Sequence, residues 1–231
     1  MANILIKAVS NLMDQMLSIS KVVGVRAWEP ATIYEVDLHL PAIDFDKWKT
    51  IKRVKCKVDD FQYRDYTPAL WDAEKKICTL YLEAGHNGAG GRWAKSLQAG
   101  DEVFLGVAHA AQLPASKGKI LCLADGSALG HCLSLKQLTD REDYPLDVAV
   151  FLHDNYRIPE LLVTDNPDFE FIGNPDGNMI DVLEKWYLSK DLNTYTSIYI
   201  AGYIPMVTAL RKKLKAIPQV QAKMYAYGFW S

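Results

Sequence analysis

The stretch RDYT, residues 64–67, places three side chains of complementary chemistry within one short segment. Arg64 can form forked, charge-assisted hydrogen bonds with a phosphate group. Tyr66 offers a flat apolar face to another planar ring, and the Thr67 hydroxyl can donate to or accept from the polar edge of that ring. A strand that only had to fold would alternate apolar and polar residues here. The stretch therefore indicates a ligand site, although the same residue types also occur by chance in ordinary strands.

A glycine-rich turn, GHNGAGGRWAKSL, follows at residues 85–97. Gly88, Gly90 and Gly91 directly precede a helix expected to begin near Arg92. Glycines in this position let backbone N–H groups approach a phosphate at the helix N-terminus. Such turns are also common as plain structure. His86, in the same turn, is placed either to contact a ligand or to face solvent.

The composition excludes several other classes of function. The chain has 231 residues, of which 49% are hydrophobic and 23% are charged, as in a soluble globular protein. Its formal net charge of -2 provides no field for a polyanion, so nucleic acid is not an expected partner. The cysteines have no CxxC pair and no histidine at ligand spacing, which argues against a metal site and a disulfide framework: Cys56, Cys78, Cys122 and Cys132. Reduced thiols in the cytoplasm are the simpler interpretation.

The N-terminal segment predicts an amphipathic helix over residues 3–18, docked on the body of the protein. Its apolar residues recur at helical spacing: Ile4, Ala8, Leu12 and Met16. Lys7 and Asp14 interrupt the apolar run and no small-residue cleavage site follows, so a signal peptide is not expected. No later window has the length of a membrane span. A partner-binding or membrane-surface role for this helix remains the alternative.

The remaining chain divides into two parts with different periodicity. Short alternating runs bounded by Pro, Gly and Asp occupy residues 22–109, interrupted by one short helix near RWAKSL, as in an all-β barrel or sandwich. After a linker at residues 113–118, strands at 119–124, 146–152 and 197–202 alternate with helical patterns, as in a parallel α/β sheet. We therefore expect a β + α/β protein. Residues 1–114 would form the helix and an antiparallel β-barrel, and residues 115–231 a small parallel-sheet domain.

RDYT followed by GHNGAGGRWAKSLQAGDEV resembles the flavin-binding signature of the ferredoxin reductase superfamily. Within it, the chain resembles the siderophore-interacting, ferric-siderophore reductase family more closely. Further matching segments are Trp93-Ala94, Gly100-Asp101, AGYIPMVTALRKKL and the ending at residues 227–230. The chain departs from that pattern in two places: Ala84-Gly85 replaces a histidine-glycine pair, and GAGG replaces a GPAS-like loop, which removes a serine hydroxyl from the expected phosphate site.

The resemblance implies that the first domain binds FAD. Arg64 would bind the flavin phosphate, Tyr66 would stack on the ring and Thr67 would contact its redox end. The full set of residues expected at the flavin is Arg64, Asp65, Tyr66, Thr67, His86, Gly88, Gly90, Gly91, Arg92, Trp93 and Trp230. The aromatic C-terminal segment would cover the ring and regulate hydride access, or else only close the second domain by packing.

The second domain is expected to bind NADPH or NADH. The turn LADGSALG follows a strand and opens a helix, where such folds bind ligands, although no GxGxxG fingerprint is present. A glycine after strand SIYIAG would let nicotinamide approach. The expected nucleotide-binding residues are Asp125, Gly126, Ser127, Ala128, Arg157 and Gly202. Cations near the adenosine end favour NADPH, unless they only solvate helix faces: His153, Arg157, Arg211, Lys212, Lys213 and Lys215.

The function implied is an FAD-dependent NAD(P)H oxidoreductase that reduces a ferric siderophore or another iron(III) chelate, with no side-chain acid or base required. A basic stripe could attract an anionic chelate or could be the solvated side of an edge strand: Lys47, Lys49, Lys52, Arg53, Lys55 and Lys57. The alternatives are a flavin or quinone reductase with another small electron acceptor, and a non-catalytic flavin-binding electron-transfer module. The oligomeric state is not indicated.

Overall fold

The computed structural model describes residues 17–231, and in it the chain forms two compact units. The first contains Ala31–Ala111 and the described residues before Trp28, and the second contains Trp28–Pro30 and Gln112–Ser231. The helix expected over residues 3–18 lies outside the described residues except at its end. There Ser18 is the first residue of a strand and its hydroxyl donates to the Leu105 carbonyl oxygen at 3.2 Å.

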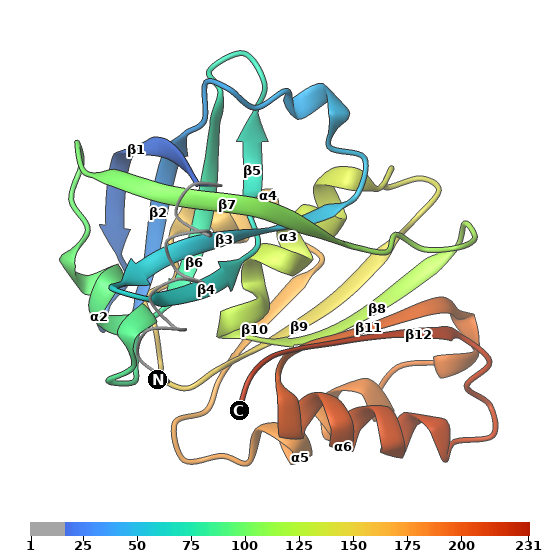
Figure 1. Cartoon of the computed structure of the whole chain (residues 1–231). Coiled ribbons are helices and arrows are strands. Elements are labelled where there is room, and N and C mark those ends of the chain that lie inside the picture. Colours follow the sequence, from blue (N-terminus) through green and yellow to red (C-terminus); the bar gives the residue numbers. More distant parts are fainter. Residues whose placement is uncertain (1–16) are drawn as a thin grey trace, which may run out of the picture. The chain divides into compact units, whose positions relative to one another are not determined.

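The first unit is built on a seven-stranded antiparallel sheet with the order β4-β3-β7-β1-β2-β6-β5 (Figure 1). Its elements are β1 (Ser18–Ala27), β2 (Ile33–His39), the 3-10 helix η1 (Phe45–Lys47), β3 (Ile51–Asp59), β4 (Gln62–Tyr66), β5 (Ala69–Asp72), β6 (Ile77–Glu83), α2 (Ala89–Ser96) and β7 (Glu102–Ala111). The expected fold class is confirmed, with an antiparallel sheet followed by a parallel α/β unit.

The expected barrel closure is wrong, because the sheet is open with β4 and β5 at its two edges. These strands follow one another in sequence, separated only by Thr67 and Pro68. Pro68 has no N–H to donate, and β5 has only four residues, with Leu70 at φ 49°. The junction thus offers too few regularly spaced backbone groups to form a ladder between the two edges.

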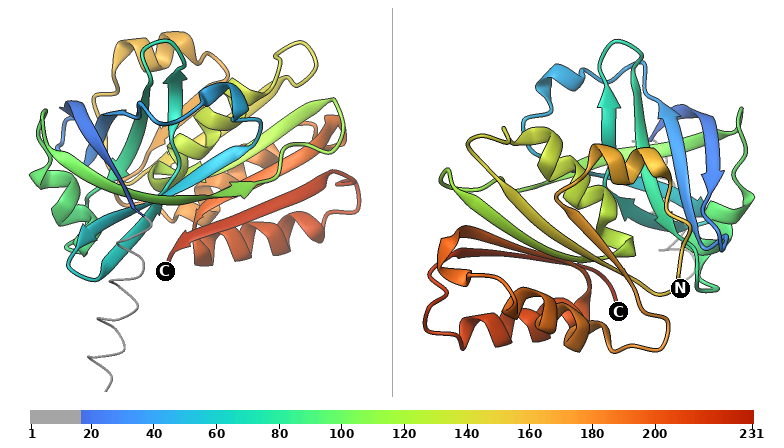
Figure 2. Two further views of the ribbon diagram at one scale, coloured as in Figure 1. Left: turned by 45° about the horizontal axis from the view of Figure 1, so that its top comes forward. Right: turned by 180° about the vertical axis from the view of Figure 1, so that it is seen from behind.

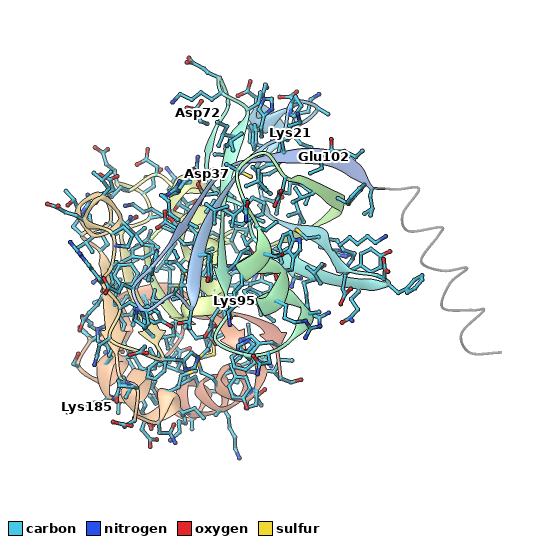
Figure 3. All side chains as sticks on the ribbon, turned by 90° about the vertical axis from the view of Figure 1, so that its left-hand side faces the viewer. Lys21, Asp37, Asp72, Lys95, Glu102 and Lys185 are labelled. Atoms are coloured by element: carbon cyan, nitrogen blue, oxygen red, sulfur yellow. The ribbon has the colours of Figure 1, made fainter. Side chains whose placement is uncertain are left out.

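Strand β3 shows how alternation builds the core of this unit. Val54, Cys56 and Val58 are buried, as the period of two predicts, while the charged residues between them are partly exposed. Paired charged residues also mark the solvent side elsewhere in the sheet. Lys21 of β1 and Glu102 of β7 are register partners, and both are exposed (Figure 3).

The second unit contains a five-stranded parallel sheet with the order β10-β9-β8-β11-β12. Its elements are β8 (Lys119–Asp125), η2 (Gly126–Ala128), α3 (Leu129–Leu138), β9 (Leu146–Leu152), α4 (Glu160–Asp165), β10 (Phe169–Gly173), α5 (Met179–Leu188), η3 (Leu192–Thr194), β11 (Tyr195–Tyr203), α6 (Ile204–Lys215) and β12 (Lys223–Trp230). The sequence predicts β8, β9 and β11 and misses β10 and β12. Helices α5 and α6 run along the same side of the sheet (Figures 1 and 2).

The strand order of the second sheet reverses direction at β8. From β8 the chain moves outward through β9 and β10, and it then returns to β11 on the other side of β8. The carboxyl ends of β8 and β11 therefore flank the point where the order reverses, which is where open α/β sheets bind ligands. No helix within residues 17–231 is long and apolar enough to cross a membrane.

Candidate functional site

Arg64, Asp65 and Tyr66 alternate across strand β4 and so have two different environments. Arg64 and Tyr66 pair in register with Cys56 and Val54 of β3 and share their face of the sheet. Asp65 lies on the other face, where its Oδ1 is 2.5 Å from the Lys55 Nζ. Asp65 is therefore engaged in an ion pair, whereas Arg64 and Tyr66 project together.

The Arg64 side chain is exposed, and its Nη1 donates to the Tyr63 carbonyl oxygen at 2.8 Å. No carboxylate in the described part of the chain pairs with it. A guanidinium that already has a neutralising carboxylate binds phosphate less well, because the two anions compete for the same donors. The exposed and uncompensated Arg64 therefore keeps its forked donors available to an anionic ligand.

The glycine turn and RDYT meet at the first turn of α2. A Cβ at Gly90 would lie 2.7 Å from the Tyr66 Oη and 3.4 Å from the Arg64 Cγ. About one helical turn after Gly90, the Trp93 ring stacks on the Tyr66 ring, with centroids 5.8 Å apart and planes at 17°. Two motifs far apart in the sequence thus form one cluster of Arg64, Tyr66, Gly90 and Trp93.

The N-terminus of α2 is suited to an anion. Gly88 is the N-cap residue, so no side chain caps the helix, and its first turn contains no acidic residue. The first N–H groups of a helix have no intrahelical acceptor, and the aligned peptide dipoles make this end positive. These backbone donors lie beside the Arg64 side chain, whose Cγ would be 3.4 Å from a Cβ at Gly90, and beside the Tyr66 ring.

We predict that Gly90→Ala weakens binding of a ligand at this cluster, whereas Gly88→Ala does not. The added methyl group at position 90 must displace the rigid Tyr66 ring, because it would lie 2.7 Å from the phenol oxygen. At Gly88 nothing lies within 4 Å of an added Cβ and φ is -69°, so alanine fits there. FAD titrations of both variants should show at least a fivefold loss for Gly90→Ala alone, on the order of 1 kcal/mol. If the two variants bind FAD with equal affinity, Gly90 is not part of the binding site.

Other first-unit residues expected at the flavin lie directly after β4, in the glycine turn and in α2. Thr67 is buried, at 7% exposure, whereas His86 is exposed. Gly91 must remain glycine because a Cβ there would be 2.4 Å from the His86 carbonyl oxygen. Arg92 donates to the Asn87 carbonyl oxygen at 2.7 Å and lies 3.6 Å from the Asp59 carboxylate. Burial raises the pKa of the Tyr66 phenol, so its hydroxyl remains a donor at neutral pH.

In the second unit, Asp125 forms the centre of the carboxyl edge between β8 and β11. It is fully buried and accepts hydrogen bonds from the Ser127 N–H at 3.0 Å and the Tyr203 N–H at 2.7 Å. It also accepts the Ser127 hydroxyl proton. Ala128 is likewise fully buried, and Gly126 is buried. Any contact of this turn with a nucleotide would therefore come mainly from its backbone and from Ser127.

Gly202 occupies the corresponding turn after β11. Its φ is +128°, and a Cβ there would lie 2.5 Å from all three carboxyl atoms of Asp125. Glycine is required by the backbone conformation and by the close approach of the carboxylate. The structure thus brings Asp125, Ser127 and Gly202 together, as the topology of the sheet requires.

Trp230 joins the same edge through contacts that the sequence did not predict. Its Nε1 donates to the Ser127 Oγ at 3.0 Å, and its ring packs on Tyr203 with centroids 4.4 Å apart. The missed signal was the alternation of the final segment, which makes β12 a strand. Tyr225 of this strand stacks on Tyr199 of β11, with centroids 4.5 Å apart, and Tyr227 packs against His131 of α3 at 5.0 Å.

Of the cations expected near the adenosine end, two lie just after β9, His153 and Arg157, and the others lie in α6: Arg211, Lys212, Lys213 and Lys215. The Arg157 backbone N–H donates to the Glu29 carbonyl oxygen at 2.7 Å, while its side chain is exposed and has no carboxylate partner within residues 17–231. The His153 ring contacts Phe151 and Trp230, with centroids 5.5 and 6.5 Å away. The Lys213 Nζ instead lies 2.7 Å from the Glu184 carboxylate of α5, so its charge is already paired with an acidic side chain.

Comparison with known proteins places the fold. No family model matches the chain, and no curated protein matches its sequence. The structure is similar to the siderophore-interacting protein from Acinetobacter baumannii, with a TM-score of 0.74, 15% identity and coverage of 93% of this chain and 89% of that one. It is also similar to a siderophore-interacting protein from Aeromonas hydrophila, with a TM-score of 0.71, 12% identity and coverage of 93% of this chain and 91% of that one.

A ferredoxin NADP+ reductase from Neisseria gonorrhoeae, solved with FAD and NADP bound, is also similar in structure. Its TM-score is 0.67 at 16% identity, with coverage of 92% of this chain and 98% of that one. The resemblance to these two groups that the sequence indicates is therefore confirmed at the level of the fold. Sequence identities this low carry no substrate or activity from one chain to the other.

Proposed function

We propose that this protein is an FAD-dependent NAD(P)H oxidoreductase. The observation that carries the proposal is the meeting of Arg64 and Tyr66 with the uncapped, glycine-rich N-terminus of α2. A diphosphate joined to a planar ring system matches this set of groups, since the anion needs donors and the ring needs a flat apolar contact. The similar fold of a reductase with FAD and NADP bound supports the same pairing of cofactors.

In this proposal, the residues of the first unit bind and orient the flavin. Arg64 and the first backbone N–H groups of α2 bind the pyrophosphate, and the exposed Gly88 contributes through its backbone alone, which an alanine there would keep. Tyr66, held in orientation by the Trp93 ring, supports the ring system, and Thr67 contacts its polar edge. When bound, FAD supplies the chemistry of accepting a hydride and passing electrons on one at a time. His86, Gly91 and Arg92 shape the surrounding turn, and Asp65 supports β4 from its other face through the ion pair with Lys55.

The pyridine nucleotide would bind at the carboxyl edge of the second unit. The η2 turn and Gly202 give it backbone donors and room for close approach, and Arg157 and His153 lie after β9, where a 2'-phosphate would favour NADPH over NADH. Trp230 would respond to nicotinamide entry, because its ring now packs on Tyr203 and its N–H is bound by Ser127. Its contact with the flavin, expected from the sequence, is part of this proposal.

The electron acceptor we propose is a ferric siderophore or another iron(III) chelate. The similar folds of two siderophore-interacting proteins support this substrate class. The basic residues of β3 support attraction of an anionic chelate only in part, since Lys55 is already paired with Asp65. A flavin or quinone reductase uses the same first half-reaction and differs only in the acceptor. The four cysteines are free and buried, which is consistent with a reducing, cytoplasmic location.

One observation favours a second candidate, a flavin-binding electron-transfer module without nucleotide turnover. The Asp125 carboxylate accepts the N–H groups of Ser127 and Tyr203, which are donors that a pyrophosphate at this edge would use. A buried anion so close to the turn also repels a second one. Reduction of the flavin by NADPH separates the module from the enzyme.

We predict that the purified protein binds FAD and that NADPH bleaches the bound flavin. Calorimetric titration measures the first step and stopped-flow absorbance the second, with NADH as the matched comparison. Iron(II) released from a panel of chelates, trapped by a colorimetric ligand, then identifies the acceptor. A protein that takes up no FAD would end the proposal, whereas FAD binding without bleaching would leave the electron-transfer module.

A further inference from the structure

Strand β12 has the properties of an edge that accepts another strand. It is the last strand in the sheet order, and β11 is its one strand neighbour among the described residues. Its eight residues carry a single charge, Lys223, and include four aromatic rings. Natural edge strands are usually short or protected by charge, because a long apolar edge readily pairs with another chain. This edge lacks that protection.

A groove lies beside this strand, between β12 and α6. Its volume is about 640 Å³, and one wall is a single face of α6 while the other is the edge strand. Two small exposed residues of β12 line the groove, Ala226 and Gly228, and the Ile204 side chain packs over Gly228, where an added Cβ would lie 2.5 Å from its Cγ1. The helix wall has an apolar end near Ile204 and Val207 and a cationic end in its last turns: Arg211, Lys212 and Lys215.

None of the three cations of this groove is neutralised by a residue between positions 17 and 231. No acidic residue lines the groove, and Arg211, Lys212 and Lys215 have no ion pair with any residue in the described chain. Lys213, on another face of the same helix, is paired with Glu184, so the helix does pair its charges where acids are present. A groove with apolar and cationic ends beside an open strand edge has the pattern of a peptide-binding surface.

We propose that an extended, acidic segment of a partner polypeptide adds to β12 as a sixth strand of this five-stranded sheet. Its backbone pairs with the free edge, and alternate side chains enter the groove. Apolar side chains contact Ile204 and Val207, and carboxylates contact Arg211 and Lys215. The twelve residues of α6 span about 18 Å at 1.5 Å per residue, which matches roughly five to six residues of a strand.

The positive charge of the groove favours an acidic strand over a second copy of this chain, and the size of the groove favours it over a small anion. Pairing of β12 with a second copy would bring two identical sets of three cations into one interface without an acid, which is unfavourable. A small anion would reach only the cationic end and leave the apolar end and the strand edge unused. An acidic strand satisfies all three parts of the surface.

The test uses fluorescence anisotropy with labelled eight-residue peptides and the full-length protein. The probe SVSVSESE presents two valines and two glutamates on one face, and the reversed sequence ESESVSVS covers the other strand direction. We expect one of the two to bind at least tenfold more tightly than its lysine counterpart. The triple variant Arg211→Gln, Lys212→Gln, Lys215→Gln should lose at least tenfold. The control Lys21→Gln, Lys49→Gln, Lys75→Gln, which removes the same charge from the first unit, should bind as the native protein does.

Two further measurements distinguish strand addition from attraction by charge. Peptides N-methylated at only odd or only even positions keep every side chain but lose the N–H groups on one edge. We expect one of the pair to lose at least tenfold and the other to bind normally. Equal binding by both methylated peptides, or by the glutamate and lysine versions, would refute the proposal. A dimer in sedimentation velocity that binds no peptide would assign the edge to a second copy instead. None of these readouts requires bound FAD, so they are independent of the proposed redox function.

Discussion

Replacing Arg64 with alanine is expected to lower the affinity for FAD by roughly 10- to 150-fold, because a hydrogen bond to a charged group contributes about 1.5–3 kcal/mol. The side chain is exposed, has no carboxylate partner in the described chain and passes the first turn of α2, where its Cγ would be 3.4 Å from a Cβ at Gly90. Truncation therefore removes a forked phosphate donor without exposing a buried charge. Isothermal titration with FAD measures the change directly.

Two matched variants make the Arg64 result interpretable. Arg64→Lys keeps the charge but loses the planar fork, so we expect an intermediate loss of affinity. Lys75→Ala removes the same charge from an exposed hairpin of the same unit and should leave FAD binding unchanged. An Arg64→Ala protein that melts normally and binds FAD as tightly as the native chain would show that Arg64 is not a cofactor ligand.

Gly202→Ala is expected to destabilise the second unit by about 3 kcal/mol or more. The residue has φ +128°, which costs an L-amino acid strain, and its new Cβ would lie 2.5 Å from the Asp125 carboxyl group. Moving that carboxylate would also weaken the bond from the Tyr203 N–H, whose loss leaves a buried anion less well satisfied. Urea denaturation followed by aromatic fluorescence measures the loss.

Gly100→Ala is the matched control for the backbone contribution. Its φ is +99°, but nothing lies within 4 Å of an added Cβ. We therefore expect a cost of only about 1–2 kcal/mol from the backbone. If both variants lose the same stability, the close contact with Asp125 has no energetic consequence, and the tight carboxyl edge is not what requires glycine at position 202.

The local motifs were predictable because they depend on residue type and short spacing. RDYT and the glycine turn need only side-chain chemistry and backbone freedom, and both are properties of the sequence itself. The same holds for β3, where alternation alone predicted the burial of Val54, Cys56 and Val58. The sequence likewise predicted two parts with different periodicity, an antiparallel sheet and a parallel one.

Three features could not be predicted without the tertiary structure. They are the open edges of the first sheet, the contacts at the carboxyl edge of the second sheet, and strands β10 and β12. Pro68 is visible in the sequence as a break between two strands, but only the strand order shows that β4 and β5 lie at the two edges of the sheet and do not pair. The sequence did not predict β10, because the strand is short. It did not predict β12, because the four aromatic residues there were interpreted as a packed chain end and not as a strand.

By itself, the sequence determined which residues could bind a phosphate and a planar ring, and the type of each half of the chain. Only the tertiary structure decided which of them meet. Gly90 lies against Tyr66, and Trp230 reaches Ser127 across more than one hundred residues of sequence, because side chains of distant segments pack where the sheet order brings strand ends together. Asp125 was expected at a nucleotide, and the structure adds that its buried carboxylate accepts the N–H groups of Ser127 in the following turn and of Tyr203 in β11, since a buried carboxylate needs donors.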